Sequence, residues 1–260
     1  MIIHASRLAA EREIKELAPQ VDGATVSFLA EMYSSTHLLG TESREPVALM
    51  AAVRIAIAQG SEINRLARSI DAARTLEIGL AYGFSAVWML EAILLKDESC
   101  HVAVDPFEKV VWAGVGLEQV GRYCTRSSAF QWIPETSLEA LTSFIRSGET
   151  IDLAFIDGDH RFDSALLDFF LVDQILRVGG IVAFDDLWMP AIRTVASFVE
   201  TNRSYRLIPQ QARNMVAFEK LADDGREWDH FVPFQVHRSK RVLQRRLAIG
   251  LEYLKRGFRR

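Results

Sequence analysis

Two apolar runs in this sequence of 260 residues end directly in acidic residues. Residues 153–156 lead into Asp157, and residues 181–184 lead into Asp185 and Asp186. If the runs form neighbouring parallel strands, their carboxyl ends meet at one sheet edge and the three carboxylates converge. Carboxylates so close repel one another, so either their pKa values rise or a cation lies among them. Oxygen ligands of this number suit a hard divalent ion, and we predict Mg²⁺.

Helix capping is an alternative role for acids at these positions. Asp163 and Ser164 are plausible N-caps of a following helix, and Asp159 could serve only to brace the loop. Capping explains the pair at 185–186 less well, because Pro190 starts the next helix several residues later. We therefore favour metal ligation.

A turn that contains two glycines follows an earlier apolar run. This run ends at Ile78, and Gly79 and Gly83 precede a helix that opens at Phe84. We expect glycine here because a Cβ would collide with a ligand lying against the backbone at the carboxyl edge of a parallel sheet. Tight strand-to-helix turns also use glycine for purely steric reasons, so the spacing alone is weak evidence for a ligand.

Two acids beside this turn indicate a nucleoside ligand. Glu77 lies in the last turn of the strand, where an unpaired buried carboxylate is costly and a cationic ligand would pair with it. Asp105 closes the next strand, where a carboxylate can accept both ribose hydroxyls. A dinucleotide fits less well, because Leu80 and Ala81 follow Gly79 and no third glycine packs the helix.

A parallel α/β scaffold must bring these residues together. From residue 74 onward, short apolar runs alternate with helical segments, which is typical of βαβ units. Strands are expected at 75–78, 101–104, 130–133, 153–156, 181–184, 205–208 and 215–218. The intervening helices are expected to begin near Phe84, Val111, Leu138, Phe162 and Ala191. We predict an α/β, Rossmann-like fold: a seven-stranded, mostly parallel sheet with helices on both faces and an N-terminal helical cap.

The chain divides into three predicted parts: a helical cap at 1–70, a main domain at 71–236 and a basic amphipathic helix at 237–260. In the cap, apolar residues recur at helical spacing, including a set between residues 47 and 57. Gly179-Gly180 should end the helix that contains Leu176, because glycine tolerates the left-handed conformation of a helix C-terminus.

Taken together, these motifs resemble the class I methyltransferases that use S-adenosylmethionine. Residues 76–79 with 82–85 resemble the first motif of that class, and residues 104–107 resemble its second-strand acid. With the later acids, the chain resembles metal-dependent small-molecule O-methyltransferases of the catechol and caffeoyl-coenzyme A type. It is more similar still to the bacterial group that contains macrocin and macrolide-sugar O-methyltransferases. The likeness covers roughly residues 74–220.

The resemblance implies a role for each matching residue. The methionine end of the cofactor would contact Glu77, Ser85 and the glycine turn, Asp105 would hold the ribose, and residues 136–137 would border the adenine. The cofactor-binding residues so implied are Glu77, Gly79, Ala81, Tyr82, Gly83, Ser85, Asp105, Pro106, Thr136, Ser137 and Asp157. The metal ligands so implied are Asp157, Asp185 and Asp186.

The same resemblance implies that His160 is the catalytic base, with Asp157 beside it. An ordinary histidine pKa near about 6.5 suits proton transfer at neutral pH. A metal that binds a hydroxyl lowers the pKa of that hydroxyl, as it does for water. We therefore expect methyl transfer to a hydroxylated small molecule. The alternatives are a metal-binding relative of the cephalosporin-hydroxylase-like group and a non-catalytic subunit that binds S-adenosylmethionine.

Aromatic residues just beyond strand ends could wall an apolar substrate pocket. The candidates are Tyr82, Phe107, Trp112 and Trp188. Trp188 is the preferred one because it follows the proposed ligand pair, whereas core packing is the better interpretation of Tyr82. His101 is interpreted as an ordinary strand residue.

Charge and composition exclude some classes of protein. A net charge of −4 argues against a general nucleic-acid binder. Cys100 and Cys124 should be free thiols rather than a disulfide or zinc site. The apolar stretches are shorter than the roughly 20 residues that cross a bilayer, and the first residues lack a leader pattern, so we expect a cytoplasmic protein.

The C-terminal tail carries the opposite charge to the rest of the chain. Residues 238–260 hold nine basic residues against Glu252 alone. We expect this helix to pack on its own domain or on a partner subunit, and we expect a homo-oligomer, most simply a dimer. Weak contact with an anionic membrane surface is the second interpretation.

Overall fold

A seven-stranded sheet forms the centre of the molecule, seen in a computed structural model that describes residues 6–43 and 45–235. Its strands are β3 (Arg74–Ile78), β4 (Cys100–Val104), β5 (Phe130–Ile133), β6 (Ile151–Ile156), β7 (Leu176–Phe184), β8 (Tyr205–Ile208) and β9 (Val216–Lys220). They lie in the order β5-β4-β3-β6-β7-β9-β8, and β9 runs in the opposite direction to the other six strands. The predicted fold class is confirmed.

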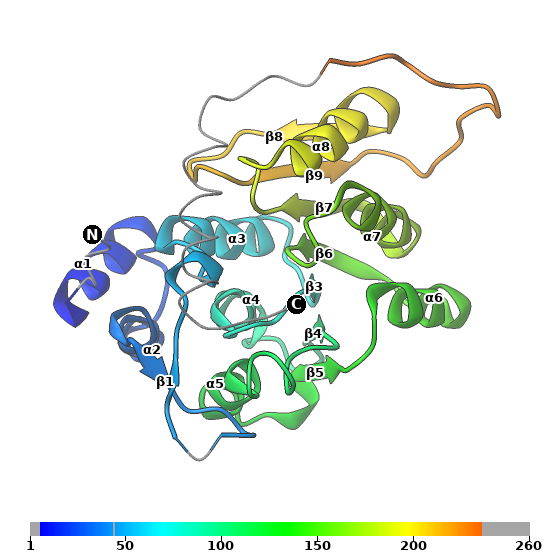
Figure 1. The fold of residues 1–260 in the computed structure, drawn as a ribbon. Helices are drawn as coiled ribbons and strands as arrows, with labels where there is room; N and C mark the ends of the chain where they lie inside the picture. The colour runs from blue at the N-terminus through cyan, green and yellow to red at the C-terminus, as the bar shows by residue number, and fades with distance from the viewer. Residues whose placement is uncertain (1–5, 44, 236–260) are drawn as a thin grey trace.

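Helices cover both faces of this sheet (Figure 1). On one face lie α3 (Ile57–Ser69), α4 (Phe84–Ile93) and α5 (Val115–Tyr123), and on the other lie α6 (Ser137–Ser147), α7 (Phe162–Ile175) and α8 (Pro190–Asn202). Side chains alternate along a strand, so Leu153 and Phe155 join the first core while Ala154 and Ile156 join the second. Burial on both faces explains why the central strands are continuous apolar runs.

The strand order reverses at β3, which has β4 on one side and β6 on the other. The chain leaves β3 into α4 on one face and leaves β6 into α7 on the opposite face. A crevice opens at such a switch point, beyond the carboxyl ends of the strands, and ligands bind there in open α/β sheets. Because Ile78 pairs with Ile156, the turn after β3 lies beside Asp157.

The prediction that Gly179-Gly180 end a helix is wrong. The helix α7 ends at Ile175, and both glycines lie within β7. The register between β6 and β7 shifts near Ile151, and Gly179 has a φ of +78°, which together mark a β-bulge. A Cβ on Gly180 would lie 2.8 Å from the carbonyl oxygen of Asp152, so close backbone packing requires this glycine.

One helix start also differs from the prediction. The helix expected near Val111 begins at Val115, because the preceding residues form turns in which Val111 N donates to the carbonyl oxygen of Phe107 at 2.7 Å. The other four predicted starts lie within one residue of the observed ones.

The segment before β3 is mostly helical, as predicted, but not throughout. It contains α1 (Arg7–Leu17), α2 (Gly23–Ser34), α3 and a short antiparallel ribbon of β1 (His37–Leu38) and β2 (Val47–Ala48). This ribbon and the 3₁₀ turn Ala51–Val53 replace the helix expected between residues 47 and 57. Ile14, Leu29 and Ile63 pack in the same core as Phe155. The three-part division of the chain stays a prediction.

The basic tail at 237–260 lies outside the described residues, and so do the subunit and membrane contacts predicted for it. Within the described ranges, the helices are all too short or too polar to cross a bilayer. Cys100 and Cys124 are both free thiols, as predicted.

Candidate active site

A cavity of about 610 Å³ opens at the switch point between β3 and β6. Nine residues predicted to bind the cofactor line it: Gly79, Ala81, Tyr82, Ser85, Asp105, Pro106, Thr136, Ser137 and Asp157. His160, Asp185 and Asp186 line the same cavity, whereas Glu77 and Gly83 do not. The fold thus brings the glycine turn and the acidic residues to one chamber.

The turn after β3 packs tightly against the end of β6. Gly79 has a φ of +96°, and a Cβ there would clash with the backbone carbonyl oxygen of Asp157. The amide of Asp157 in turn donates to the carbonyl oxygen of Ile78 at 3.0 Å. The sequence predicts glycine at position 79 because a ligand would approach the backbone there. The contact with the carbonyl oxygen of Asp157 is by itself sufficient to require a glycine.

Glu77 lies behind the cavity wall and positions Ser85, which is on it. The Ser85 hydroxyl donates to Glu77 Oε2 at 2.5 Å, and His101 Nε2 lies 3.0 Å from Glu77 Oε1. Thr75 Oγ1 lies 2.9 Å from the other ring nitrogen of His101. Both Glu77 oxygens therefore have partners inside the protein. In this structure Glu77 acts on the cavity through Ser85, and His101 is a site residue that the sequence interpretation missed.

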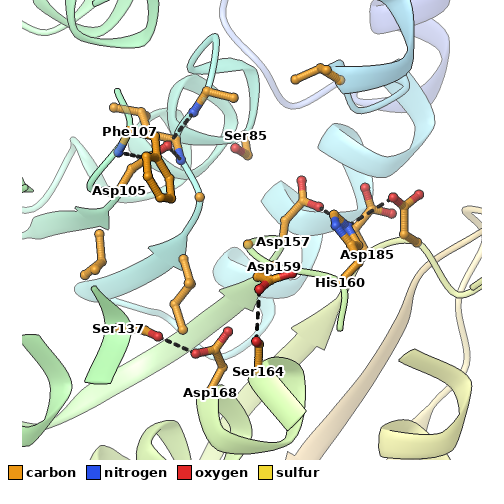
Figure 2. Close-up of a pocket in the computed structure, with 18 of the residues that line it drawn as sticks. Ser85, Asp105, Phe107, Ser137, Asp157, Asp159, His160, Ser164, Asp168 and Asp185 are labelled. Carbon is orange, nitrogen blue, oxygen red and sulfur yellow. Dashed lines mark hydrogen bonds and ion pairs between the residues drawn. The ribbon is translucent and has the colours of Figure 1, made fainter. Parts of the chain in front are cut away.

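Asp105 anchors the glycine turn. Its Oδ2 accepts hydrogen bonds from the backbone amides of Leu80 at 3.0 Å and Ala81 at 3.2 Å. Its Oδ1 accepts from the amide of Phe107 at 2.8 Å, as Figure 2 shows. A carboxylate has about four lone-pair positions, so capacity remains for further donors from the cavity.

The far end of the cavity is formed by the start of α6 and by α7. Thr136 is the N-cap of α6 and forms a capping box with Glu139. The next residue, Ser137, donates to Asp168 Oδ1 at 2.5 Å across to α7 (Figure 2). Burial raises the pKa of Asp168 to about 6. Asp168 lines the cavity and was not predicted.

His160 lies between two carboxylates. Its Nε2 is 3.4 Å from Asp157 Oδ1 and 3.1 Å from Asp186 Oδ2. Burial raises the pKa of Asp157 to about 6. Burial disfavours the charged form of His160, but the two carboxylates outweigh it and raise the pKa of His160 to about 10. The neighbouring loop is braced separately, since Asp159 accepts from the Ser164 hydroxyl at 3.0 Å.

Neighbours on two sides hold Asp186 in place. Trp188 Nε1 donates to Asp186 Oδ1 at 2.6 Å, and Asn214 Nδ2 donates to the same oxygen at 3.1 Å. Burial opposes ionisation of Asp186, yet contact with His160 keeps the pKa of this carboxyl below its ordinary value. Trp188 is not among the residues that line the cavity, contrary to our preference for it as a pocket residue.

Asp185 points to a different partner. Its Oδ1 accepts a hydrogen bond from Gln59 Nε2 of α3, while Gln59 Oε1 accepts from the amide of Ala56 at 2.9 Å. Burial, together with the charges of Asp157 and Asp186, raises the pKa of Asp185 well above its ordinary value. Gln59 therefore connects the N-terminal helices to the acidic cluster.

The donor set at this cluster fits a divalent cation. Asp157, His160 and Asp186 each offer one ligand atom, and these atoms lie within 4.8 Å of one another. Within the described chain, the buried His160 Nε2 makes no well-directed hydrogen bond, so its one lone pair can bind a cation or a proton but not both at once. Carboxylates suit Mg²⁺ or Mn²⁺, and an imidazole adds affinity for transition metals. Asp185, the third predicted ligand, is not in this group.

Residues from the N-terminal segment complete the cavity wall beside the acidic cluster. Tyr82 Oη accepts a hydrogen bond from the amide of Met50 at 3.2 Å. The Tyr82 ring packs edge-on against Trp112, with 5.5 Å between the ring centroids. Tyr82 is buried, in agreement with the core role preferred for it, although it also borders the cavity. The apolar residues that line the cavity include Met50, Val53, Ile55, Phe107, Trp112 and Met189.

A parallel sheet with a glycine turn and an acid at neighbouring strand ends defines a nucleoside-binding α/β domain. Residues 76–187 of the chain match the family described as a methyltransferase domain. The resemblance to the class I methyltransferases is confirmed over this segment.

Known proteins support this assignment over part of the chain. A flavonoid 3',5'-methyltransferase of Vitis vinifera is 26% identical over 145 residues, which are 54% of this chain and 58% of the relative. A catechol O-methyltransferase of Mycobacterium tuberculosis is 29% identical over 145 residues, which are 51% of this chain and 63% of the relative. The chain thus spans about three fifths of the length of the curated relatives that it matches.

Solved structures share the fold. An O-methyltransferase from Streptomyces achromogenes, in complex with S-adenosylmethionine, has a TM-score of 0.56 at 18% identity and covers 65% of this chain and 82% of its own. A methyltransferase from Podospora anserina, bound to S-adenosylhomocysteine, has a TM-score of 0.60 at 17% identity and covers 86% of this chain and 99% of its own.

Proposed function

We propose that this protein is an S-adenosylmethionine-dependent O-methyltransferase that acts on a hydroxyl group of a small molecule with the help of a divalent cation. One observation carries the proposal. The cavity that contains Ser85 and the glycine turn also contains the cluster of Asp157, His160 and Asp186. A methyl donor and an acceptor hydroxyl can therefore lie next to each other, and positioning of that kind supplies much of the catalysis of a two-substrate reaction.

The cofactor would lie along the carboxyl edge from β3 to β5. Ser85, oriented by Glu77, would hold the methionine end beside the backbone of Gly79. Asp105 would accept the ribose hydroxyls, and residues 136–137 would border the base. Bound there, S-adenosylmethionine supplies a sulfonium methyl group for transfer to an oxygen.

Asp157 and Asp186 would hold the cation, which when bound makes an acceptor hydroxyl more acidic. We assign His160 as the residue that takes the proton from this hydroxyl. Because the two carboxylates raise the pKa of His160, its Nε2 is free to accept a proton at neutral pH only when a cation shares their charge. Asp185 would not bind the cation but would tie the acidic cluster to α3, through its hydrogen bond from Gln59.

The acceptor proposed is a hydroxylated aromatic compound. The names of the relatives include a flavonoid methyltransferase and a catechol O-methyltransferase. The apolar residues Met50, Trp112 and Met189 line the cavity that also contains the acidic cluster, and they would suit a flat ring.

A methyl-transfer assay on a panel of catechols, flavonoids and hydroxylated sugars tests the proposal. We expect S-adenosylhomocysteine to be released with at least one acceptor, and the release to stop in excess chelator. Asp157→Ala should abolish it, while Asp163→Ala, an exposed acid on α7, should leave it unchanged. Tight binding of S-adenosylmethionine without product on any acceptor would contradict catalysis and would indicate a cofactor-binding subunit.

A further inference from the structure

Asp168 is a buried carboxylate on the cavity wall that the proposed reaction does not use. It belongs to α7, its residue is only 3% exposed, and Ser137 of α6 donates to its Oδ1 at 2.5 Å. Figure 2 shows this pair apart from His160, with Ser164 and Asp159 drawn between them. A buried carboxylate is costly unless it is paired, so the place of Asp168 on the buried side of α7 needs an explanation.

Only one oxygen of Asp168 has a partner in the protein. Within the described residues, Oδ2 accepts no hydrogen bond. Gly158, which also lines the cavity, has no side chain, and a Cβ there would lie 3.8 Å from Oδ2. Since Asp168 lines the cavity, this oxygen remains available to a ligand that enters it.

The position of Asp168 corresponds to one end of the proposed cofactor. Ser85 lies beside the methionine end and Asp105 beside the ribose, so the nucleobase must lie beyond Asp105, towards the start of α6. Ser137 and Gly158 border that end of the cavity, and Asp168 lies between them. The base of the cofactor is an adenine, which carries an amino group at carbon 6 as a hydrogen-bond donor.

We propose that Asp168 recognises the adenine base of the cofactor by accepting a hydrogen bond from its 6-amino group, with Ser137 fixing the carboxylate in place. The inference rests on the proposed function, since it assumes that the cofactor binds in this cavity. A carboxylate in this position selects for an amino group and against a 6-oxo group, because two acceptors would then face each other without a donor. Asp168 would therefore exclude hypoxanthine and guanine nucleosides.

Calorimetric titration with two ligands tests the assignment. S-adenosylhomocysteine carries the 6-amino group, and its deaminated analogue, S-inosylhomocysteine, carries a 6-oxo group. We expect the native protein to bind the first more tightly by roughly 100-fold or more, as sites built around a hydrogen bond do. In Asp168→Asn the amide can donate to the 6-oxo group, so the preference should fall by at least about tenfold.

The ratio of the two affinities makes the test independent of folding. Asn has the shape of Asp and can still accept from Ser137, and any unfolded fraction reduces both titrations alike. Asp163→Asn, on the exposed side of the same helix, is the matched control and should keep the native ratio. An unchanged ratio in Asp168→Asn would show that Asp168 only joins α7 to α6. Failure of the native protein to bind S-adenosylhomocysteine would instead overturn the proposed function itself.

Discussion

His160 Nε2 lies 3.1 Å from Asp186 Oδ2, and Asp157 Oδ1 approaches the same nitrogen at 3.4 Å. The proposed base is thus in direct contact with both proposed metal ligands. Loss of either carboxylate therefore changes the electrostatic environment of His160 as well as the donor set for the cation. For this reason the metal site is better tested through the residues that support Asp186 than by removal of Asp186 itself.

Asn214→Ala should weaken cation binding. Asn214 donates to Asp186 Oδ1 at 3.1 Å, and loss of such a supporting contact typically lowers metal affinity by about 10- to 100-fold. Titration with Mg²⁺ and Mn²⁺ would measure this, and binding of S-adenosylhomocysteine should stay within a few-fold of native. The control is Asn202→Ala, which removes a buried amide that contacts Val232 instead. Equal metal affinities in the two variants would argue against ligation by Asp186.

Ser85→Ala should weaken cofactor binding by roughly tenfold, the equivalent of about 1.4 kcal/mol. The substitution removes a hydroxyl from the cavity wall and also leaves Glu77 Oε2 without its donor at 2.5 Å. The dissociation constant of S-adenosylhomocysteine is the quantity to measure. Thr201→Ala is the control, because that hydroxyl donates to the carbonyl oxygen of Ser197 in α8, away from the cavity. A native dissociation constant in Ser85→Ala would remove this serine from the site.

Gly79→Ala should destabilise the fold more than Gly148→Ala does. Both glycines have positive φ, at +96° and +73°, so an alanine at either position costs about 1–2 kcal/mol in backbone strain. Only at Gly79 would the new Cβ meet another atom, the carbonyl oxygen of Asp157, which adds about 1–3 kcal/mol. Urea denaturation of the two variants compares the costs. If both variants lose the same free energy of unfolding, the close packing of β3 on β6 does not restrict this position.

Glu108→Gln should remove a pH dependence of stability. Glu108 is buried, its Oε1 accepts from the amide of Leu117 at 3.2 Å, and burial together with the charges of Asp105 and Glu77 raises its pKa from 4.5 to about 8. Between these values the folded protein keeps a proton that the unfolded chain has lost. The free energy of unfolding therefore decreases as pH rises through this window.

The glutamine variant keeps the acceptor for Leu117 and carries no titrating proton. The free energy of unfolding of the variant, relative to that of the native protein, should therefore rise by a few kcal/mol between pH 4.5 and about 8, at about 1.4 kcal/mol per pKa unit. Urea denaturation across that range measures it. Glu98→Gln, at an exposed position, should show no such trend. Parallel pH profiles for native protein and Glu108→Gln would show that Glu108 is ionised throughout.

The sheet could be predicted because its strands are marked by local patterns. The edge strands Phe130–Ile133 and Tyr205–Ile208 agree with the prediction residue for residue, since turns and polar residues bound each run. The pair Gly179-Gly180 was misinterpreted because two glycines suit a helix end and a β-bulge equally well. That choice depends on the neighbouring strand, which a local pattern does not contain.

The candidate site, like the fold, could be predicted only in part. Acids at strand ends, such as Asp105 and Asp157, could be found because the strand itself indicates where its carboxyl end lies. The partners that orient the site depend on contacts between distant segments. Gln59 and Asp185 are 126 residues apart, and His101 reaches Glu77 only because the register of β3 and β4 sets His101 opposite Thr75. Sheet register and helix packing decide these contacts, and both are tertiary properties.

Transfer of a labelled methyl group tests whether this protein is an O-methyltransferase. The protein would be incubated with S-adenosylmethionine that carries a trideuterated methyl group, together with a catechol acceptor and Mg²⁺, and the product would be analysed by mass spectrometry. We predict one trideuteromethyl group on an acceptor oxygen with the native protein and none with Asp157→Ala. Unlabelled acceptor after incubation with native protein that binds the cofactor, across catechols, flavonoids and sugars alike, would contradict it.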